Sequence, residues 1–286
     1  MSPRILRALM QLFALFSSFN EEKYSERRRF VTSFLEEEIL KDEVDDYAII
    51  FDQFYNQYIK RKGRSRVEKE IASSSVKILS LCNILNEELT QQQKIVILIK
   101  LLEILRLEGQ MSEQTREFIT IIAESLKIPT EEFSFIRDFI FEPKENFLGK
   151  DRYLVITSKS SLNPNISHLN VDGLSEEIYV LYIKIQNLIV FYIDGNKEVY
   201  LNQRLLRPFR MYLLPYGYAL RVSSIQPIYY SDILSNFVSE KSKVKIAFEA
   251  DKISYKFRDN KIGVRPLSFI ERNARLVGIM GASGSG

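Results

Sequence analysis

The residues best suited to chemistry stand at the C-terminal end of the chain. The apolar run 276–280 leads into a glycine-rich segment, Gly281-Ala282-Ser283-Gly284-Ser285-Gly286. Gly281 and Gly286 have the spacing of the two glycines in the phosphate-binding pattern G-x-x-x-x-G-K-[ST]. Because glycine tolerates left-handed backbone conformations, successive amides of such a turn can point at one phosphate. We therefore expect a strand over 275–280 that ends in the frame of a phosphate-binding loop.

A flexible linker is the second interpretation of this segment, since linkers have the same composition. The preceding residues favour the first interpretation, because a strand pattern leads directly into the glycines. Short strands are predicted at 244–248, 253–257, 267–270 and 275–280, with a polar turn at 258–260. In the phosphate-loop interpretation the lysine and hydroxyl residue follow Gly286, so no catalysis is expected of these residues.

Three segments carry a family resemblance: Ile253-Ser254-Tyr255-Lys256-Phe257, Pro266-Leu267-Ser268-Phe269-Ile270 and the run 276–286. Together they resemble the opening of an ABC-transporter ATP-binding cassette. The resemblance implies ATP and Mg²⁺ as cofactors of the whole protein, with neither held tightly by this chain. It also implies a transmembrane transport domain as partner and a cytoplasmic location at the inner face of the membrane.

The same resemblance implies an aromatic residue that stacks on adenine at the end of the first hairpin. Phe257 matches by position, and Tyr255 is the second choice; an aromatic face is a suitable platform for a base. The alternative is that both are ordinary alternating strand residues. The family's glycine before the loop is absent from 271–275, where Asn273 can form the same kind of turn.

Composition indicates a globular protein and argues against several functions. The 286 residues are 45% hydrophobic and 27% charged, with a net charge of +3, which is too low to predict nucleic-acid binding. Cys82 is the single cysteine, so no internal disulfide forms, and we expect it to be buried and inert. His168 has no second histidine or cysteine nearby, so we predict no metal site. The apolar stretch 8–19 is too short to span a bilayer.

The first half of the chain has the apolar spacing of helices. Helices are predicted over 4–19, 25–40, 44–61, 65–86, 91–107, 112–126 and 130–140. Ser25, Thr90, Ser112 and Thr130 are expected to be N-caps, and Gln93 completes a capping box with Thr90. The segments around Ser25-Glu26 and Ser112-Glu113 resemble each other, which suggests a pseudo-two-fold bundle.

The segment 107–113, followed by 128–133, resembles the tellurite-resistance TerB-like helical fold. That resemblance covers about the first 140 residues and implies acidic residues in a metal-binding turn. Only Glu108 matches this acidic pattern, and Gln110 departs from it. We therefore expect a solvated turn that binds no metal. The basic run 60–66 is expected to be an exposed connection, with an anion or lipid-headgroup patch as the second interpretation.

Beyond a boundary at 143–149 the pattern changes to short β-branched and aromatic runs, typical of a small β-sandwich. Strands are predicted over 153–157, 178–185, 188–193, 198–201, 211–214 and 219–222. Asp194-Gly195-Asn196 predicts a hairpin, and Pro215-Tyr216-Gly217 a further turn.

The segment 190–217 resembles the second half of a forkhead-associated domain, a family that binds phosphothreonine peptides. Asn202 matches an asparagine near the recognition loops of that family. The Gly-Arg pair, serine and histidine of its first half have no counterpart, and Ser167-His168 has the wrong spacing. A structural role is therefore favoured, and Arg204, Arg207 and Arg210 are left as phosphate ligands only if the fold brings them together.

We thus expect a multidomain α+β protein with an all-α helical bundle, a small β-sandwich and the first strands of an ATP-binding cassette. The boundaries are 1–143 for the TerB-like bundle, 150–240 for the forkhead-associated-like part and 244–286 for the truncated cassette. The expected function is the N-terminal regulatory and interaction region of an ABC transporter ATP-binding protein. The alternative is a non-enzymatic adaptor that binds a phosphorylated or acidic protein partner through the β part.

Overall fold

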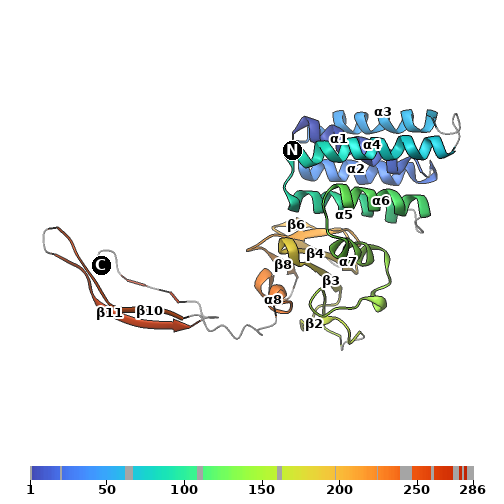
Figure 1. Ribbon diagram of the computed structural model, residues 1–286. Coiled ribbons are helices and arrows are strands. Elements are labelled where there is room, and N and C mark those ends of the chain that lie inside the picture. The colour runs from blue at the N-terminus through green and yellow to red at the C-terminus, as the bar shows by residue number, and fades with distance from the viewer. Residues whose placement is uncertain are drawn as a thin grey trace. The chain divides into compact units, whose positions relative to one another are not determined.

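The computed structural model contains two compact units, Met1–Val238 and Ser239–Gly286. It describes residues 2–19, 21–61, 67–107, 112–159, 163–196, 198–223, 225–238, 247–258, 261–272, 277–278 and 280–281. Helices come first in the chain and strands follow, so the protein is α+β, as predicted (Figure 1).

The predicted helices are confirmed, with ends that differ by at most a few residues. They are α1 (Pro3–Ser17), α2 (Tyr24–Glu38), α3 (Val44–Arg61), α4 (Val67–Glu88), α5 (Gln91–Arg106), α6 (Glu113–Ser125) and α7 (Thr130–Phe141). Helix α1 packs against α2, α3, α4 and α5, and its apolar side chains are buried on every side. Cys82 is buried on α4, as expected, and burial raises the pKa of its thiol to about 12. Within the described residues no helix is long and apolar enough to cross a membrane.

Two of the four predicted N-caps are correct. The Thr90 side chain caps α5 in a capping box with Gln93, and Ser112 caps α6. Ser25 and Thr130 were wrong, because Lys23 and Pro129 are the residues that precede the first turns of α2 and α7. A short 3₁₀ turn, Glu21–Lys23, runs directly into α2 and moves its start ahead of Ser25. The suggested repeat therefore has a serine cap only in its second copy.

Two sheets follow the helices. The first has the order β2-β1-β3-β4-β7, and only its β1–β2 pair is parallel among the described pairs. Its strands are β1 (Tyr153–Thr157), β2 (Ser167–Asn170), β3 (Glu177–Ile183), β4 (Leu188–Asp194) and β7 (Tyr212–Leu214). The second has the order β6-β5-β8-β9, with β5 (Val199–Leu201), β6 (Arg204–Leu205), β8 (Ala219–Val222) and β9 (Ile228–Tyr229). A short helix, α8 (Tyr230–Ser235), follows β9.

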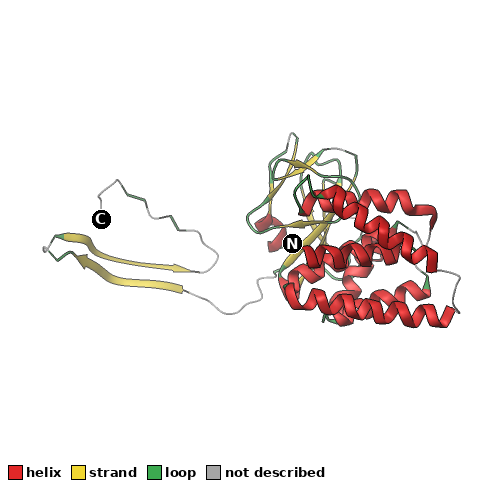
Figure 2. Ribbon diagram, turned by 90° about the horizontal axis from the view of Figure 1, so that it is seen from above, coloured by secondary structure: helices red, strands yellow, loops and turns green. Residues whose placement is uncertain are grey.

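The first sheet is covered on both faces, which explains why its strands are apolar without alternation. Along β1, Leu154 and Ile156 join the core shared with the second sheet, whereas Tyr153 and Val155 join the helical core. Helix α7 packs on the sheet beside β3, and most helices of the first unit lie together beside its strands in Figure 2. Just before the edge strand β7, the backbone N–H of Met211 donates to the buried Glu103 carboxylate of α5 at 2.8 Å. The first sheet thus separates two cores, one shared with the helices and one shared with the second sheet.

Asp194-Gly195-Asn196 does not close a hairpin, contrary to the prediction. It carries the chain from β4 in the first sheet to β5 in the second. Gly195 is required by packing, since a Cβ there would lie 2.4 Å from Cγ of Glu176. The β3–β4 hairpin is closed instead by residues 184–187, with Asn187 in the left-handed region at φ 51°. The Pro215–Gly217 turn is confirmed by the hydrogen bond from Tyr218 N–H to the Pro215 carbonyl at 3.2 Å.

The second unit contains a hairpin of β10 (Ala247–Lys256) and β11 (Ile262–Arg272). The described parts of the strands predicted over 244–248 and 253–257 belong to one strand, β10. The irregular pairing between Ala250 and Ile253 bends this strand. The strand expected over 275–280 is not formed at Val277, Gly278 or Met280, the described residues of that stretch.

Candidate functional site

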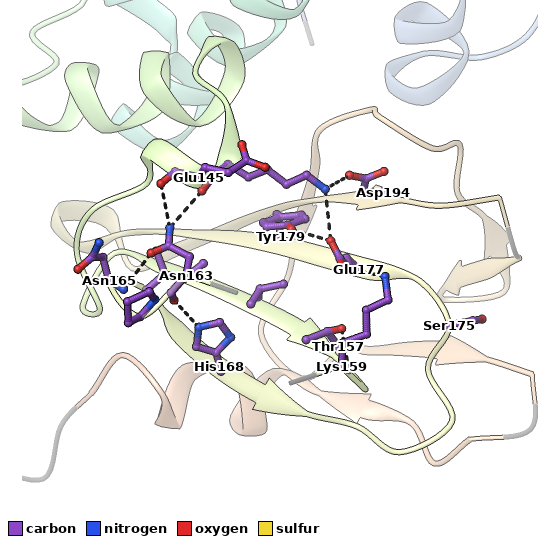
Figure 3. Close-up of a pocket in the computed structure, with 14 residues that line it drawn as sticks. Glu145, Thr157, Lys159, Asn163, Asn165, His168, Ser175, Glu177, Tyr179 and Asp194 are labelled. Atoms are coloured by element: carbon purple, nitrogen blue, oxygen red, sulfur yellow. Dashed lines mark hydrogen bonds and ion pairs between the residues drawn. The ribbon is translucent and has the colours of Figure 1, made fainter. Parts of the chain in front are cut away.

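A polar cavity of about 460 Å³ opens on the face of the first sheet, where α7 ends (Figure 3). Its size lies within the range of small-molecule sites. Most of the residues that line it carry charged, amide or hydroxyl side chains. The lining residues are Lys144, Glu145, Val155, Thr157, Lys159, Asn163, Pro164, Asn165, Ile166, His168, Ser175, Glu177, Tyr179 and Asp194.

Local sequence explains how the charged groups reach the cavity. Pro143 disfavours a helical conformation at the residue before it, so α7 ends at Phe141 and Glu142 is extended. The short 3₁₀ turn that follows, Lys144–Asn146, places Lys144 over the sheet. Glu177 begins β3 and Asp194 ends β4, and the antiparallel register sets these two residues directly opposite each other.

Two like charges at directly paired positions repel each other unless a cation lies between them. Lys144 supplies that cation: its Nζ lies 3.3 Å from Oε2 of Glu177 and forms a short ion pair with Asp194. The same ammonium stands 4.8 Å from the ring centre of Tyr179. Lys159 contacts the other oxygen of Glu177 at 3.1 Å. Glu177 is therefore the hub of the charged wall.

Burial alone raises the pKa of the Glu177 carboxyl. Hydrogen bonds from Tyr179, Lys159 and Lys144 outweigh that effect and bring the pKa to about 2. The Tyr179 hydroxyl donates to Oε2 of Glu177 at 2.7 Å, and burial together with this bond raises the pKa of Tyr179. A carboxylate held ionised by three donors is a poor proton acceptor at neutral pH. The arrangement suits binding of a small polar ligand better than proton transfer.

The opposite wall is organised by Asn163. Its side-chain amide donates to the carbonyls of Lys144 and Phe147 at 3.2 and 3.1 Å, and its Oδ1 accepts from the Asn165 N–H at 2.9 Å. The Asn163 carbonyl lies 2.7 Å from Nε2 of His168, which is the donor because a carbonyl only accepts. Within the described residues no group of three or more His, Cys, Asp or Glu side chains could hold a metal ion.

Sequence reasoning missed this cavity. His168 was considered only as a possible metal ligand, whereas it lies on β2 and lines the cavity. The sequence carries no sign that the Asn163 side chain bonds to the Lys144 carbonyl. The pairing of Glu177 with Asp194 was hidden as well, because Asp194-Gly195-Asn196 was predicted to form a hairpin.

Most of the predicted phosphate loop lies outside the described residues, namely Ala282, Ser283, Gly284, Ser285 and Gly286. Gly281 is described and exposed. Phe257 stands at the end of β10 with 52% of its surface exposed, and its ring meets the edge of Tyr255 at 5.1 Å between centroids. A Cβ on Gly263 would approach both rings to 2.8 Å, so this glycine makes room for the pair.

The remaining sequence candidates fall in different places. Glu108 and Gln110 of the TerB-like turn, residues 62–66 of the basic run, and Asn273 lie outside the described residues. Asn202 is exposed between β5 and β6 at φ 48°. Arg204, Arg207 and Arg210 do not converge on one point, since each meets a different residue of α2.

Comparison of the chain with protein-family models, curated proteins and solved structures finds no match in any of the three.

Proposed function

We propose that this chain is the N-terminal regulatory and interaction region of an ABC-type ATPase. Residues 1–143 would be its TerB-like bundle and residues 150–240 a forkhead-associated-like β part. The hairpin of β10 and β11 would open the ATP-binding cassette. The apolar face of that hairpin is the observation that carries the proposal.

Strand pairing defines this face, because paired residues project to the same side of a sheet. Ala250 pairs with Phe269, Ile253 with Leu267, and Tyr255 with Val264. Ile253 and Tyr255 keep 53% and 54% of their surface exposed, and Leu267 keeps 48%. A two-stranded hairpin is at best marginally stable alone. We infer that this face packs against further strands and a core of the same cassette.

Phe257 gives the hairpin a function in nucleotide binding. Its ring is half exposed at the end of β10, and Tyr255 supports it from one edge. A supported, exposed ring can stack on adenine, and such stacking contributes about 1–3 kcal/mol per base. ATP and Mg²⁺ are thus proposed as ligands of the whole protein, with phosphate contacts from Gly281 through Gly286.

The polar cavity supplies the proposed regulatory part. A ligand there would contact Lys144 and Lys159 from two connections and Glu177 from β3, and so would link the end of α7 to the sheet. The proposal includes a transmembrane transport domain as partner and a cytoplasmic location at the inner face of the membrane. No nucleic acid is proposed as a partner.

The coding sequence beyond Gly286 tests the proposal first: lysine followed by serine or threonine is expected, and any other pair removes the phosphate loop. The second test measures ATP hydrolysis by a chain that continues through the cassette. F257A is expected to raise KM for ATP at least about fivefold, whereas F257Y keeps an aromatic face and restores it. Equal KM values for the F257A and unaltered proteins would remove Phe257 from the nucleotide site.

A further inference from the structure

A second groove lies between α2 and residues 206–211, the segment that joins β6 to β7. Its volume is about 550 Å³. It is lined by Tyr24, Ser25, Arg28, Arg29, Thr32, Ser33, Glu36 and Arg207. Because positions 25, 28, 29, 32 and 36 recur at three- and four-residue spacing, α2 turns one polar face toward the groove. Arginines from two segments remote in sequence line it.

The position of Arg207 is set by the fold. Its guanidinium Nη1 donates to Oγ of the buried Ser33 at 3.2 Å, and its backbone N–H donates to the Tyr212 hydroxyl at 2.8 Å. Phe209, two residues later, has φ 58°, which a side chain other than glycine rarely adopts, and its N–H is bonded to the Ile193 carbonyl at 2.9 Å. Such backbone strain persists only where the surroundings impose it. The segment therefore presents Arg207 in a defined place.

The neighbouring arginines fasten this segment to α2 at other points. Arg204 forms an ion pair with Glu37. The guanidinium of Arg210 lies 3.9 Å from the ring centre of Phe30. These two side chains are occupied with structural contacts, whereas Arg207 lines the groove.

Basic residues outnumber acidic ones in the lining of the groove. Arg28 is oriented by Asp52, whose carboxylate oxygens lie 3.2 and 3.1 Å from its Nε. Arg29 is exposed and forms no ion pair with the described residues. Glu36 is the one acidic residue among those that line the groove. Planar guanidinium groups match the oxygens of a phosphate, to which they can donate two parallel hydrogen bonds.

We propose that this groove binds the phosphate monoester of a phosphorylated ligand, with Arg29 and Arg207 as its ion-pairing residues and Arg28 and Ser25 as further donors. This site is separate from the proposed nucleotide site and does not depend on ATP hydrolysis. The phosphate can belong to a soluble ester or to a lipid headgroup, which present the same chemistry to the arginines.

Calorimetry on the full 286-residue chain tests the site, with glycerol 3-phosphate as the soluble probe. Saturable one-to-one binding is expected, weakened at least about tenfold by R29Q and by R207Q, since each removes a charge-assisted contact. R221Q is the matched control: it removes an exposed arginine of β8 outside the groove, and binding should stay within about twofold.

E36Q separates loss of the site from loss of folding. Removing the carboxylate that lines the groove relieves repulsion of the phosphate, so binding should tighten by about threefold. A misfolded variant cannot bind more tightly. Weaker or unchanged binding by E36Q would contradict the proposed position of the phosphate.

Vesicles of phosphatidylcholine with and without phosphatidic acid show whether the phosphate belongs to a lipid headgroup or to a soluble ester. A lipid headgroup predicts cosedimentation with phosphatidic acid vesicles that R207Q abolishes and glycerol 3-phosphate competes away. A soluble ester predicts calorimetric binding without cosedimentation. The proposal fails if neither probe binds, or if R221Q reduces binding as much as R207Q does.

Discussion

Arg152 donates from Nη1 to both carboxylate oxygens of Glu132, at 2.7 and 2.9 Å, where both residues are buried. Glu132 belongs to α7 and Arg152 directly precedes β1. The guanidinium also lies 4.5 Å from the ring centre of Phe135. This ion pair joins α7 to the start of the first sheet.

Removing Glu132 should therefore destabilise the whole first unit. E132A leaves the Arg152 charge buried without its main partner, and the expected loss is about 3–5 kcal/mol in the free energy of unfolding. E131A is the control, because Glu131 contacts Arg152 at 3.3 Å with 74% of its side chain exposed. Its loss should stay below about 1 kcal/mol. Urea unfolding followed by circular dichroism measures both, and equal losses would contradict the role of the buried pair.

Glu177 predicts how stability depends on pH. Its pKa in the folded protein, about 2, lies below the ordinary value of 4.5, so its stabilising contribution is complete above about pH 5. That contribution is lost as the pH falls from 5 toward 2, because the unfolded chain then binds the proton more readily. E177Q should be less stable at pH 7 by on the order of 2–3 kcal/mol and should lose less stability upon acidification. The measurement is the free energy of unfolding as a function of pH for the unaltered protein and E177Q. Curves that fall in parallel upon acidification would refute this assignment.

Gly195 should not tolerate a side chain. G195A places a Cβ 2.4 Å from Cγ and 3.1 Å from Cβ of the buried Glu176, so the chain between the two sheets must shift. The expected cost is about 1–3 kcal/mol. In an E176A background the nearest clashing atom is gone, and G195A should cost measurably less. A double-mutant cycle by thermal unfolding checks this, and additive losses would place the strain elsewhere.

ATP should bind this chain weakly or undetectably by itself. Under the proposed function, Gly281 to Gly286 would supply only the frame of a phosphate site, without the lysine and metal ligands that provide most of its charge. Calorimetry with ATP and Mg²⁺ measures the affinity of the 286-residue chain for the nucleotide. Tight stoichiometric binding would overturn the interpretation of Gly281 to Gly286 as an incomplete loop.

The helices could be predicted because their signals are local. The predicted and observed bounds of 44–61 agree, and the Thr90 capping box was identified from residues three positions apart. A helical turn joins residues four apart, so spacing and caps within a short window determine where helices lie. The longer strands of the first sheet were also predicted, because each is a continuous apolar run that is visible within a short window.

Tertiary structure alone decided which remote segments meet. Sequence could not show that Glu177 pairs with Asp194 under Lys144, or that Arg207 joins Arg28 and Arg29 while Arg204 and Arg210 attach to other residues of α2. Gly195 looked like a hairpin residue until its closeness to Glu176 revealed a packing requirement. Sequence by itself determined the helices and the longer strands, because the spacing and caps that mark them are local. The cavity and the arginine groove depend on chain closure over many residues, which no short window of sequence records.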